Sequence, residues 1–274
     1  MGPTRRELLL AAGGAAFLAA CGGSDDDEQT FQLVKRWPDT PLFVPGEVRL
    51  AVSLTDGSTL LTDGPDELKG SIVDNDGAKI TDVVSRRRDQ GMTPPYWDVR
   101  AELPAAGIYT LLLGSGDASF QVFDPSEVVT PLTGSPMPGF DTPTVDDHRG
   151  VEPYCSLTPA PCPLHDVTLT DALASEKPVV YVVGTPAHCA TGVCAPGLEL
   201  VVAEHDRLGD QVVMVHADVY ADDAASEVAP AVSALEVEYE PIVYLCDDAG
   251  VIVDRLDGVW DGSELRERLD ALLA

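Results

Sequence analysis

Two cysteines separated by four residues, Cys189 and Cys194, are the pair in this sequence best suited to redox chemistry. They follow an apolar run over residues 178–184 (PVVYVVG) that is bounded by proline and glycine. Such a run predicts a central strand, and the residues after it predict a helix over about 195–208. A thiol where a helix begins faces free backbone N–H groups, which favour its thiolate. We therefore expect Cys189 to be a nucleophile and Cys194 to be its disulfide partner.

His188 directly precedes this pair and, if protonated, would stabilise a thiolate at Cys189. An exposed turn residue is the other interpretation of His188. In an intact helix, residues five apart have Cα atoms about 8–9 Å apart, whereas a disulfide spans roughly 4.4–6.8 Å. A bond between Cys189 and Cys194 therefore needs Cys189 in the loop before the helix, or an unwound first turn that Gly192 would ease. Inert thiols or metal ligands are the alternative for the pair.

The remaining cysteines beyond residue 150 have other expected roles. Cys155 and Cys162 enclose the proline-rich turn SLTPAP, which favours a short structural disulfide at the entry to the second domain. A shuttle pair that exchanges with Cys189 is the alternative. Cys246 ends an apolar run and is expected to be a buried, unpaired thiol.

The elements that must position these residues begin at about residue 151, in the order strand, helix, strand, helix, strand, strand, helix. This order, with Cys189 at the first strand–helix junction and Glu240-Pro241 at the start of the hairpin, resembles the thioredoxin-like superfamily. The resemblance implies that Cys189 and Cys194 are catalytic and that Pro241 occupies the place of the family's cis-proline. It also implies protein thiols or disulfides as substrates, with no metal and no cofactor.

The sequence departs from the usual thioredoxin pattern at three points. Four residues rather than two separate the cysteines, His188 replaces the customary Trp, and Val182 and Val183 stand where an acidic residue is usual. The wider gap is similar to one class of peroxiredoxins, although Arg207 and Arg255 offer no clear peroxide-binding arginine. A copper chaperone with Cys189, Cys194 and a histidine such as His216 as ligands is another alternative. A non-enzymatic envelope binding protein with a structural Cys189–Cys194 disulfide is the remaining one.

Residues 31–125 show short β runs separated by turn sequences, for example 48–54 before TDGS and 107–113 before GSGD. This spacing predicts an all-β sandwich. The segment PAAGIY at 104–109 resembles a turn of immunoglobulin-like domains. Residues 126–150 are rich in proline and predict a semi-rigid linker. The basic cluster Arg86-Arg87-Arg88 is interpreted as a solvated strand end, or else as an anion or partner site.

The first residues predict an export signal. Residues 1–20 contain an arginine pair, Arg5-Arg6, followed by an apolar run. They resemble a twin-arginine export signal, and export by the general secretion route is the alternative. The apolar run is shorter than the roughly 20 residues that span a bilayer. Leu-Ala-Ala-Cys at 18–21 resembles a lipobox, which implies a lipid anchor on Cys21. Residues 21–30 would then be an acidic tether at the extracytoplasmic face of the cell membrane.

Composition limits the function classes. The chain has 274 residues, with 17 Lys and Arg against 46 Asp and Glu, so its formal charge is −29. Nucleic-acid binding needs surplus positive charge and is therefore not expected. The hydrophobic fraction of 45% is that of a globular protein. We predict two domains, an immunoglobulin-like β-sandwich followed by an α/β thioredoxin-like domain over 151–274. The predicted function is that of a membrane-anchored extracytoplasmic thiol–disulfide oxidoreductase.

Overall fold

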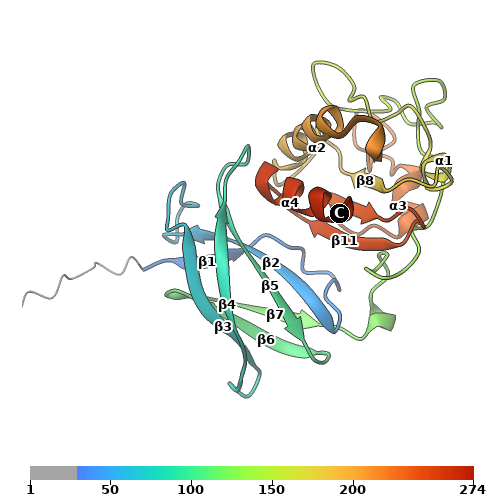
Figure 1. Cartoon of the computed structure of the whole chain (residues 1–274). Helices are drawn as coiled ribbons and strands as arrows, with labels where there is room; N and C mark the ends of the chain where they lie inside the picture. The colour runs from blue at the N-terminus through green and yellow to red at the C-terminus, as the bar shows by residue number, and fades with distance from the viewer. Residues whose placement is uncertain (1–29) are drawn as a thin grey trace, which may run out of the picture.

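The computed structural model describes residues 30–274, which form two β-sheets, one of them covered by helices (Figure 1). The predicted signal 1–20, the lipidation site Cys21 and almost all of the tether 21–30 lie outside the described residues and stay predictions. Within residues 30–274, no helix combines the length and the apolar character that crossing a membrane requires.

The first sheet has seven strands in the order β1-β2-β5-β4-β3-β6-β7, and all neighbouring pairs are antiparallel. Residues in β7 alternate between buried and exposed, so one face of this strand packs on the core while the other meets solvent. That core surrounds fully buried side chains such as Trp97 and Leu50. The strands are β1 Gln32–Lys35, β2 Gly46–Thr55, β3 Glu67–Asp74, β4 Lys79–Arg88, β5 Tyr96–Leu103, β6 Gly107–Leu113 and β7 Gly116–Val122.

The prediction that the first part of the chain is all-β is confirmed, since it forms this large antiparallel sheet. The hydroxyl of Tyr109 on β6 donates a hydrogen bond to the carbonyl of Ala105, in the turn before this strand, at 2.9 Å. A hydrogen bond of this kind, from a tyrosine to the backbone a few residues upstream, fixes a corner in many sandwich domains. The immunoglobulin-like assignment stays a prediction.

The second sheet has four strands in the order β11-β10-β8-β9, with β9 parallel to β8 and the other neighbours antiparallel. Every residue of β8 and β10 is buried, as expected for central strands covered on both faces. The strands are β8 Val179–Val183, β9 Val213–Ala217, β10 Ile242–Cys246 and β11 Ile252–Asp257. The helices are α1 Leu169–Leu173, α2 Cys194–Leu208, α3 Pro230–Leu235 and α4 Gly262–Leu272, with short 3-10 turns at Pro125–Glu127 and Gly209–Gln211.

The helices cover both faces of this sheet. Side chains of α2 and α4 share one apolar cluster with Val180 and Val182 of β8, whereas those of α1 and α3 share another with Val179 and Tyr181. Because neighbouring residues of a strand point to opposite faces, the two clusters lie on opposite sides of the sheet. The order β8-α2-β9-α3-β10-β11-α4 is the order of strands and helices predicted for this part of the chain, and the thioredoxin fold has the same order.

The proline-rich segment 126–150 lies against the second sheet. The backbone N–H of Met137 donates to the carbonyl of Gly250 at 2.8 Å, and that of Gly134 donates to the carbonyl of Ile252 at 2.7 Å. Ile252 in turn donates its N–H to Ser135 at 3.0 Å. The segment therefore pairs with the β10–β11 turn and the start of β11.

The two sheets are joined by a buried group of charged side chains. Arg49 of β2 donates from Nε and Nη2 to the two carboxylate oxygens of Glu264 on α4, each at 2.6 Å. Arg88 was expected at a solvated strand end, but its side chain is buried, which corrects that interpretation. It donates to Asp98 at 2.9 Å and to Glu267 of α4 at 2.9 Å. A cation at the end of β4 is buried there because α4 supplies an acidic partner.

Candidate functional site

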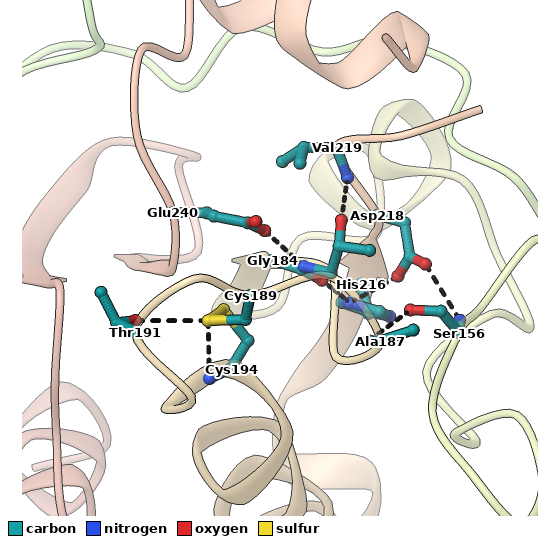
Figure 2. The surroundings of a disulfide bond; sticks show 11 residues. Ser156, Gly184, Ala187, Cys189, Thr191, Cys194, His216, Asp218, Val219 and Glu240 are labelled. Carbon is teal, nitrogen blue, oxygen red and sulfur yellow. Dashed lines mark hydrogen bonds and ion pairs between the residues drawn. A yellow bond between two sulfur atoms is a disulfide. The ribbon is translucent and has the colours of Figure 1, made fainter. Parts of the chain in front are cut away.

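Cys189 and Cys194 form a disulfide in the loop that leads from β8 into α2 (Figure 2). Their Cα atoms are 5.9 Å apart, within the range that a disulfide spans. Helix α2 begins at Cys194, so Cys189 lies in the loop before the helix, as the first of the two predicted geometries requires. Gly192 has φ of 69°, a left-handed conformation that favours glycine and lets the loop bring the two sulfurs together.

The two sulfurs differ in access. Cys194 is 2% exposed, whereas Cys189 is half-buried and packs against an apolar cluster that includes Ala51 and Tyr96 of the first sheet. The backbone N–H of Cys194 donates to Sγ of Cys189 at 3.3 Å. A donor at this position stabilises negative charge on Cys189 when the bond is open. An incoming thiol or disulfide therefore meets Cys189 before Cys194.

Pro241 lies beside the disulfide and follows a cis peptide bond, as predicted from the family resemblance. A Cβ atom added to Gly184, at the end of β8, would lie 3.1 Å from Cβ of Pro241 and 3.7 Å from Cβ of Cys194. Gly184 therefore lets the proline and the second cysteine approach the same point. The catalytic roles of Cys189, Cys194 and Pro241 stay predictions.

Two carboxyl groups near this loop, the half-buried one of Glu240 and the buried one of Asp218, were given no role from the sequence. Glu240 accepts a hydrogen bond from the N–H of Thr185 at 2.5 Å, and Asp218 accepts one from the N–H of Ser156 at 2.9 Å. Burial is the main cause that raises the pKa of both carboxyls above the ordinary value. One acid directly precedes Pro241 and the other directly follows β9, and these positions are the signals that could have identified them.

His188, predicted to stabilise the thiolate, turns toward the loop after β9. Its Nε2 lies 3.0 Å from the carbonyl oxygen of Asp223, and its ring packs edge-on against Tyr220 with centroids 5.9 Å apart. Among the described residues, no hydrogen bond joins its ring to Cys189. His188 is exposed and lies in a turn, which agrees with the alternative interpretation of this residue. The catalytic role of His188 stays a prediction.

The arginines considered for a peroxidase have other partners. Arg207 on α2 donates to Glu204 and Asp270, at 2.5 and 2.9 Å. Arg255 on β11 donates to Asp257 at 3.1 Å. The structure therefore gives neither arginine a contact with the disulfide.

A cavity of about 440 Å³ lies beside the disulfide, between the two sheets. Thr191 lines it, and the hydroxyl of this residue is 3.3 Å from Sγ of Cys189. Glu240 lines the same side, which places the segment before Pro241 next to the cavity. The opposite wall comes from the first part of the chain, namely Val34, Lys35, Arg36, Trp37, Pro38, Leu60 and Pro94.

Cys155 and Cys162 do not form the predicted disulfide, and this corrects the sequence analysis. Both are buried free thiols whose sulfurs lie 3.8 and 3.5 Å from Nδ1 of His216. The physical reason is that both sulfurs face an imidazole that the fold brings from β9. Nδ1 of His216, the histidine named as an example in the copper hypothesis, therefore faces this pair of thiols.

Cys246 is a buried free thiol, as predicted. Burial raises the pKa of this thiol to about 12, so it stays protonated at neutral pH. It therefore has no nucleophilic form in the folded protein.

Comparison with known proteins gives little. No family model and no curated protein matches this chain. A structure of AaCel9A in complex with a cellobiose-like isofagomine is similar at 10% identity and a TM-score of 0.24, over 35% of this chain and 15% of that one. The C-terminal domain of a protein assigned as a thiol-disulfide oxidoreductase from Bacteroides thetaiotaomicron is similar at 10% identity and a TM-score of 0.36, over 52% of this chain and 96% of that one. Neither similarity is close enough to say anything of this chain's chemistry. The strand order, the junction disulfide and the cis-proline are features that a thioredoxin-like fold also has.

Proposed function

We propose that this chain is a thiol–disulfide oxidoreductase that reacts through Cys189 and Cys194. The observation that carries the proposal is a disulfide whose first sulfur is accessible and whose second is buried, at the β8–α2 junction beside Pro241. The immunoglobulin-like nature of the first sheet and an extracytoplasmic location, with a lipid anchor on Cys21, belong to the same proposal. Their support is the sequence pattern of residues 1–125.

The reaction follows from the difference in access. In the reduced protein, the thiolate of Cys189 attacks one sulfur of a protein disulfide and forms a mixed disulfide, and the other substrate sulfur leaves as a thiolate. The thiolate of Cys194 then attacks Sγ of Cys189, which releases the second substrate sulfur and closes the Cys189–Cys194 bond. Two electrons pass from the protein to the substrate, and the two leaving thiolates take up protons. The reverse sequence oxidises a substrate dithiol.

Three features near the disulfide would assist these steps. The N–H of Cys194 stabilises the thiolate of Cys189, as its 3.3 Å contact in the disulfide form indicates. The cavity beside Thr191 and Glu240 would hold the substrate segment that carries the reacting sulfur. Pro241 would form one side of that segment's binding site.

A redox titration of the Cys189–Cys194 couple tests the proposal. A potential above about −300 mV is expected, because couples well below this value resist reduction and serve as structural bonds. A much lower value would support the non-enzymatic binding protein instead. The Cys194→Ser variant should accumulate a mixed disulfide with a model disulfide substrate, since no resolving thiol remains. The matched Cys189→Ser variant should form no mixed disulfide, because its remaining thiol, that of Cys194, is only 2% exposed and cannot reach the substrate.

A further inference from the structure

Four metal-binding side chains meet in the interior of the second part of the chain. Cys155, Cys162 and His165 come from the loop before α1, and His216 comes from β9. One ligand atom from each residue lies within 4.8 Å of all the others. The residues are 3%, 4%, 0% and 0% exposed, in that order. This Cys2His2 cluster is separate from the Cys189–Cys194 disulfide and has no part in the proposed exchange reaction.

The outer nitrogens of both histidines are held by backbone carbonyls. Nδ1 of His165 lies 3.1 Å from the carbonyl oxygen of Pro143, and Nε2 of His216 lies 2.8 Å from that of Gly184. Since a carbonyl only accepts hydrogen bonds, each of these nitrogens carries the proton. The inner nitrogens, Nε2 of His165 and Nδ1 of His216, then both present lone pairs to the centre of the cluster. Such carbonyl contacts orient histidines that bind metals.

The two inner nitrogens are only 3.2 Å apart. Two lone pairs at that distance repel each other, so the arrangement needs a positive charge between or beside them. Two thiols also face the same point, and thiolate sulfur binds soft and borderline metal ions strongly. A metal ion at the centre of the four atoms would satisfy every one of them.

The distances match the edges of a zinc tetrahedron. Zinc bonds of about 2.3 Å to sulfur and about 2.0–2.1 Å to nitrogen give N···N edges of about 3.3 Å and S···N edges of about 3.5 Å in a regular tetrahedron. The observed N···N distance is 3.2 Å, and the distances from Nδ1 of His216 to the sulfurs of Cys162 and Cys155 are 3.5 and 3.8 Å. All the ligand atoms lie within 4.8 Å of one another, so the four side chains can close on a single ion.

We propose that Cys155, Cys162, His165 and His216 bind one Zn²⁺ ion in a closed structural site. Two thiolates and two neutral imidazoles neutralise a divalent ion, which suits a site whose ligands are nearly inaccessible to water. A monovalent copper ion would leave a net negative charge next to the buried Asp218. With four protein ligands the ion has no open position, so its role is to fasten the loop before α1 to β9. Binding releases the two thiol protons to solvent.

The test uses the full chain, reduced with a phosphine and freed of metal with a chelator. Titration with Zn²⁺ against a chromogenic chelator is expected to show one tightly bound ion per chain. Co²⁺ should give the absorption of a tetrahedral ion together with a thiolate-to-cobalt band of two-thiolate intensity. Zn²⁺ should also raise the Tm of the reduced protein.

Variants locate the ion within the chain. Cys162→Ser and His216→Gln should each weaken Zn²⁺ binding by at least about 100-fold, the upper end of the loss known for outer-shell partners. Cys246→Ser is the matched control, because it removes a buried free thiol outside the cluster. The double variant Cys189→Ser/Cys194→Ser is the second control. Both controls should bind Zn²⁺ as the unaltered chain does.

Several results would overturn the proposal. They are the absence of stoichiometric Zn²⁺ and Co²⁺ binding by the reduced chain, binding of copper(I) alone, and binding that is lost in the Cys189→Ser/Cys194→Ser control. A Cys155–Cys162 disulfide in protein isolated without reductant would also overturn it. If the ligand variants do not fold, the cobalt spectrum of the unaltered chain decides, since its thiolate band counts the sulfur ligands directly. None of these measurements depends on oxidoreductase activity.

Discussion

Removing one partner of the buried ion pair between the two sheets should cost several kcal/mol of stability. The side chains of Arg49 and Glu264 are 6% and 0% exposed, and two hydrogen bonds of 2.6 Å join them. Tyr96 donates its hydroxyl proton to the same carboxylate at 2.5 Å, and Arg49 also donates to the carbonyl of Val259 at 2.6 Å. The substitution Glu264→Gln keeps the shape of the side chain but removes its charge. It leaves the guanidinium of Arg49 buried without a counter-charge.

The size of the effect follows from the pKa of Glu264. Burial alone would raise this pKa, but the charge and hydrogen bonds of Arg49, the hydrogen bond from Tyr96 and the charge of Arg100 together outweigh burial and lower it from 4.5 to about 2. That difference corresponds to about 3 kcal/mol of stabilisation by the ionised carboxylate. It agrees with the roughly 3–5 kcal/mol lost when one partner of a buried ion pair is removed. The contribution is complete above pH 4.5 and is lost as the pH falls from there through about 2.

Urea denaturation at pH 7 measures this loss, which we expect to be about 3–5 kcal/mol for Glu264→Gln. Adding Arg49→Met to Glu264→Gln should recover part of the lost unfolding free energy, because the double variant no longer buries an unpaired cation. Lys79 and Asp82 provide the control, since they form an exposed pair at 3.0 Å. Lys79→Met should cost less than about 1 kcal/mol. The reasoning is wrong if Glu264→Gln costs no more than this control, or if the difference between the two variants persists unchanged at pH 2.

Three further substitutions or modifications follow from the packing. Gly70→Ala would place a Cβ 1.8 Å from the carbonyl oxygen of Leu112 on β6. Overpacking typically costs roughly 1–3 kcal/mol, and we expect urea denaturation to show a loss of unfolding free energy at or above the upper end of that range. A loss below about 0.5 kcal/mol would contradict this expectation. Gly184→Ala would place a Cβ 3.1 Å from Pro241, and we expect about 1 kcal/mol of destabilisation with slower thiol exchange, measured by stopped-flow mixing with a dithiol. With a pKa of about 12, Cys246 should resist alkylation in the native reduced protein at pH 8 and react only in denaturant, as peptide mass spectrometry would show. Alkylation of native Cys246 as fast as that of an exposed thiol would refute the burial argument.

The sequence predicted the Cys189–Cys194 pairing and its setting because both depend on local order. An apolar run, a turn and a helix start place Cys189 before α2, and a proline at the start of the hairpin identifies Pro241. The need for Cys189 to lie outside the helix follows from helix geometry alone, and the Cα separation of 5.9 Å agrees with it. These features require no knowledge of contacts between distant segments.

The Cys2His2 cluster could not be predicted in the same way. Cys155 and Cys162 are close in sequence, which favoured a bond between them, whereas His216 is separated from Cys155 by 61 positions. Their meeting depends on the parallel pairing of β8 and β9 and on the path of the loop before α1. The one signal of this cluster in the sequence was a histidine, His216, within an apolar strand.

Arg88 shows the same limit. Its neighbours in sequence are two further arginines, which favoured a solvated strand end. Its burial depends on Glu267, which is 179 positions away on α4. The charge pattern of a segment therefore predicts which of its side chains are exposed only where no other element of the fold covers that segment.

The cavity beside Thr191 has a consequence for the size and shape of substrates. Its far wall belongs to the first sheet, and the Arg49–Glu264 pair and its neighbours hold that sheet in place. A substrate segment held in this cavity of about 440 Å³ would reach Cys189 past Thr191, whose hydroxyl lies 3.3 Å from the sulfur. We expect small thiols and thin, extended polypeptide segments to pass, while a disulfide buried in a compact domain is kept out. The first sheet would then act as a steric filter for the second, and opening the interface would broaden the range of substrates.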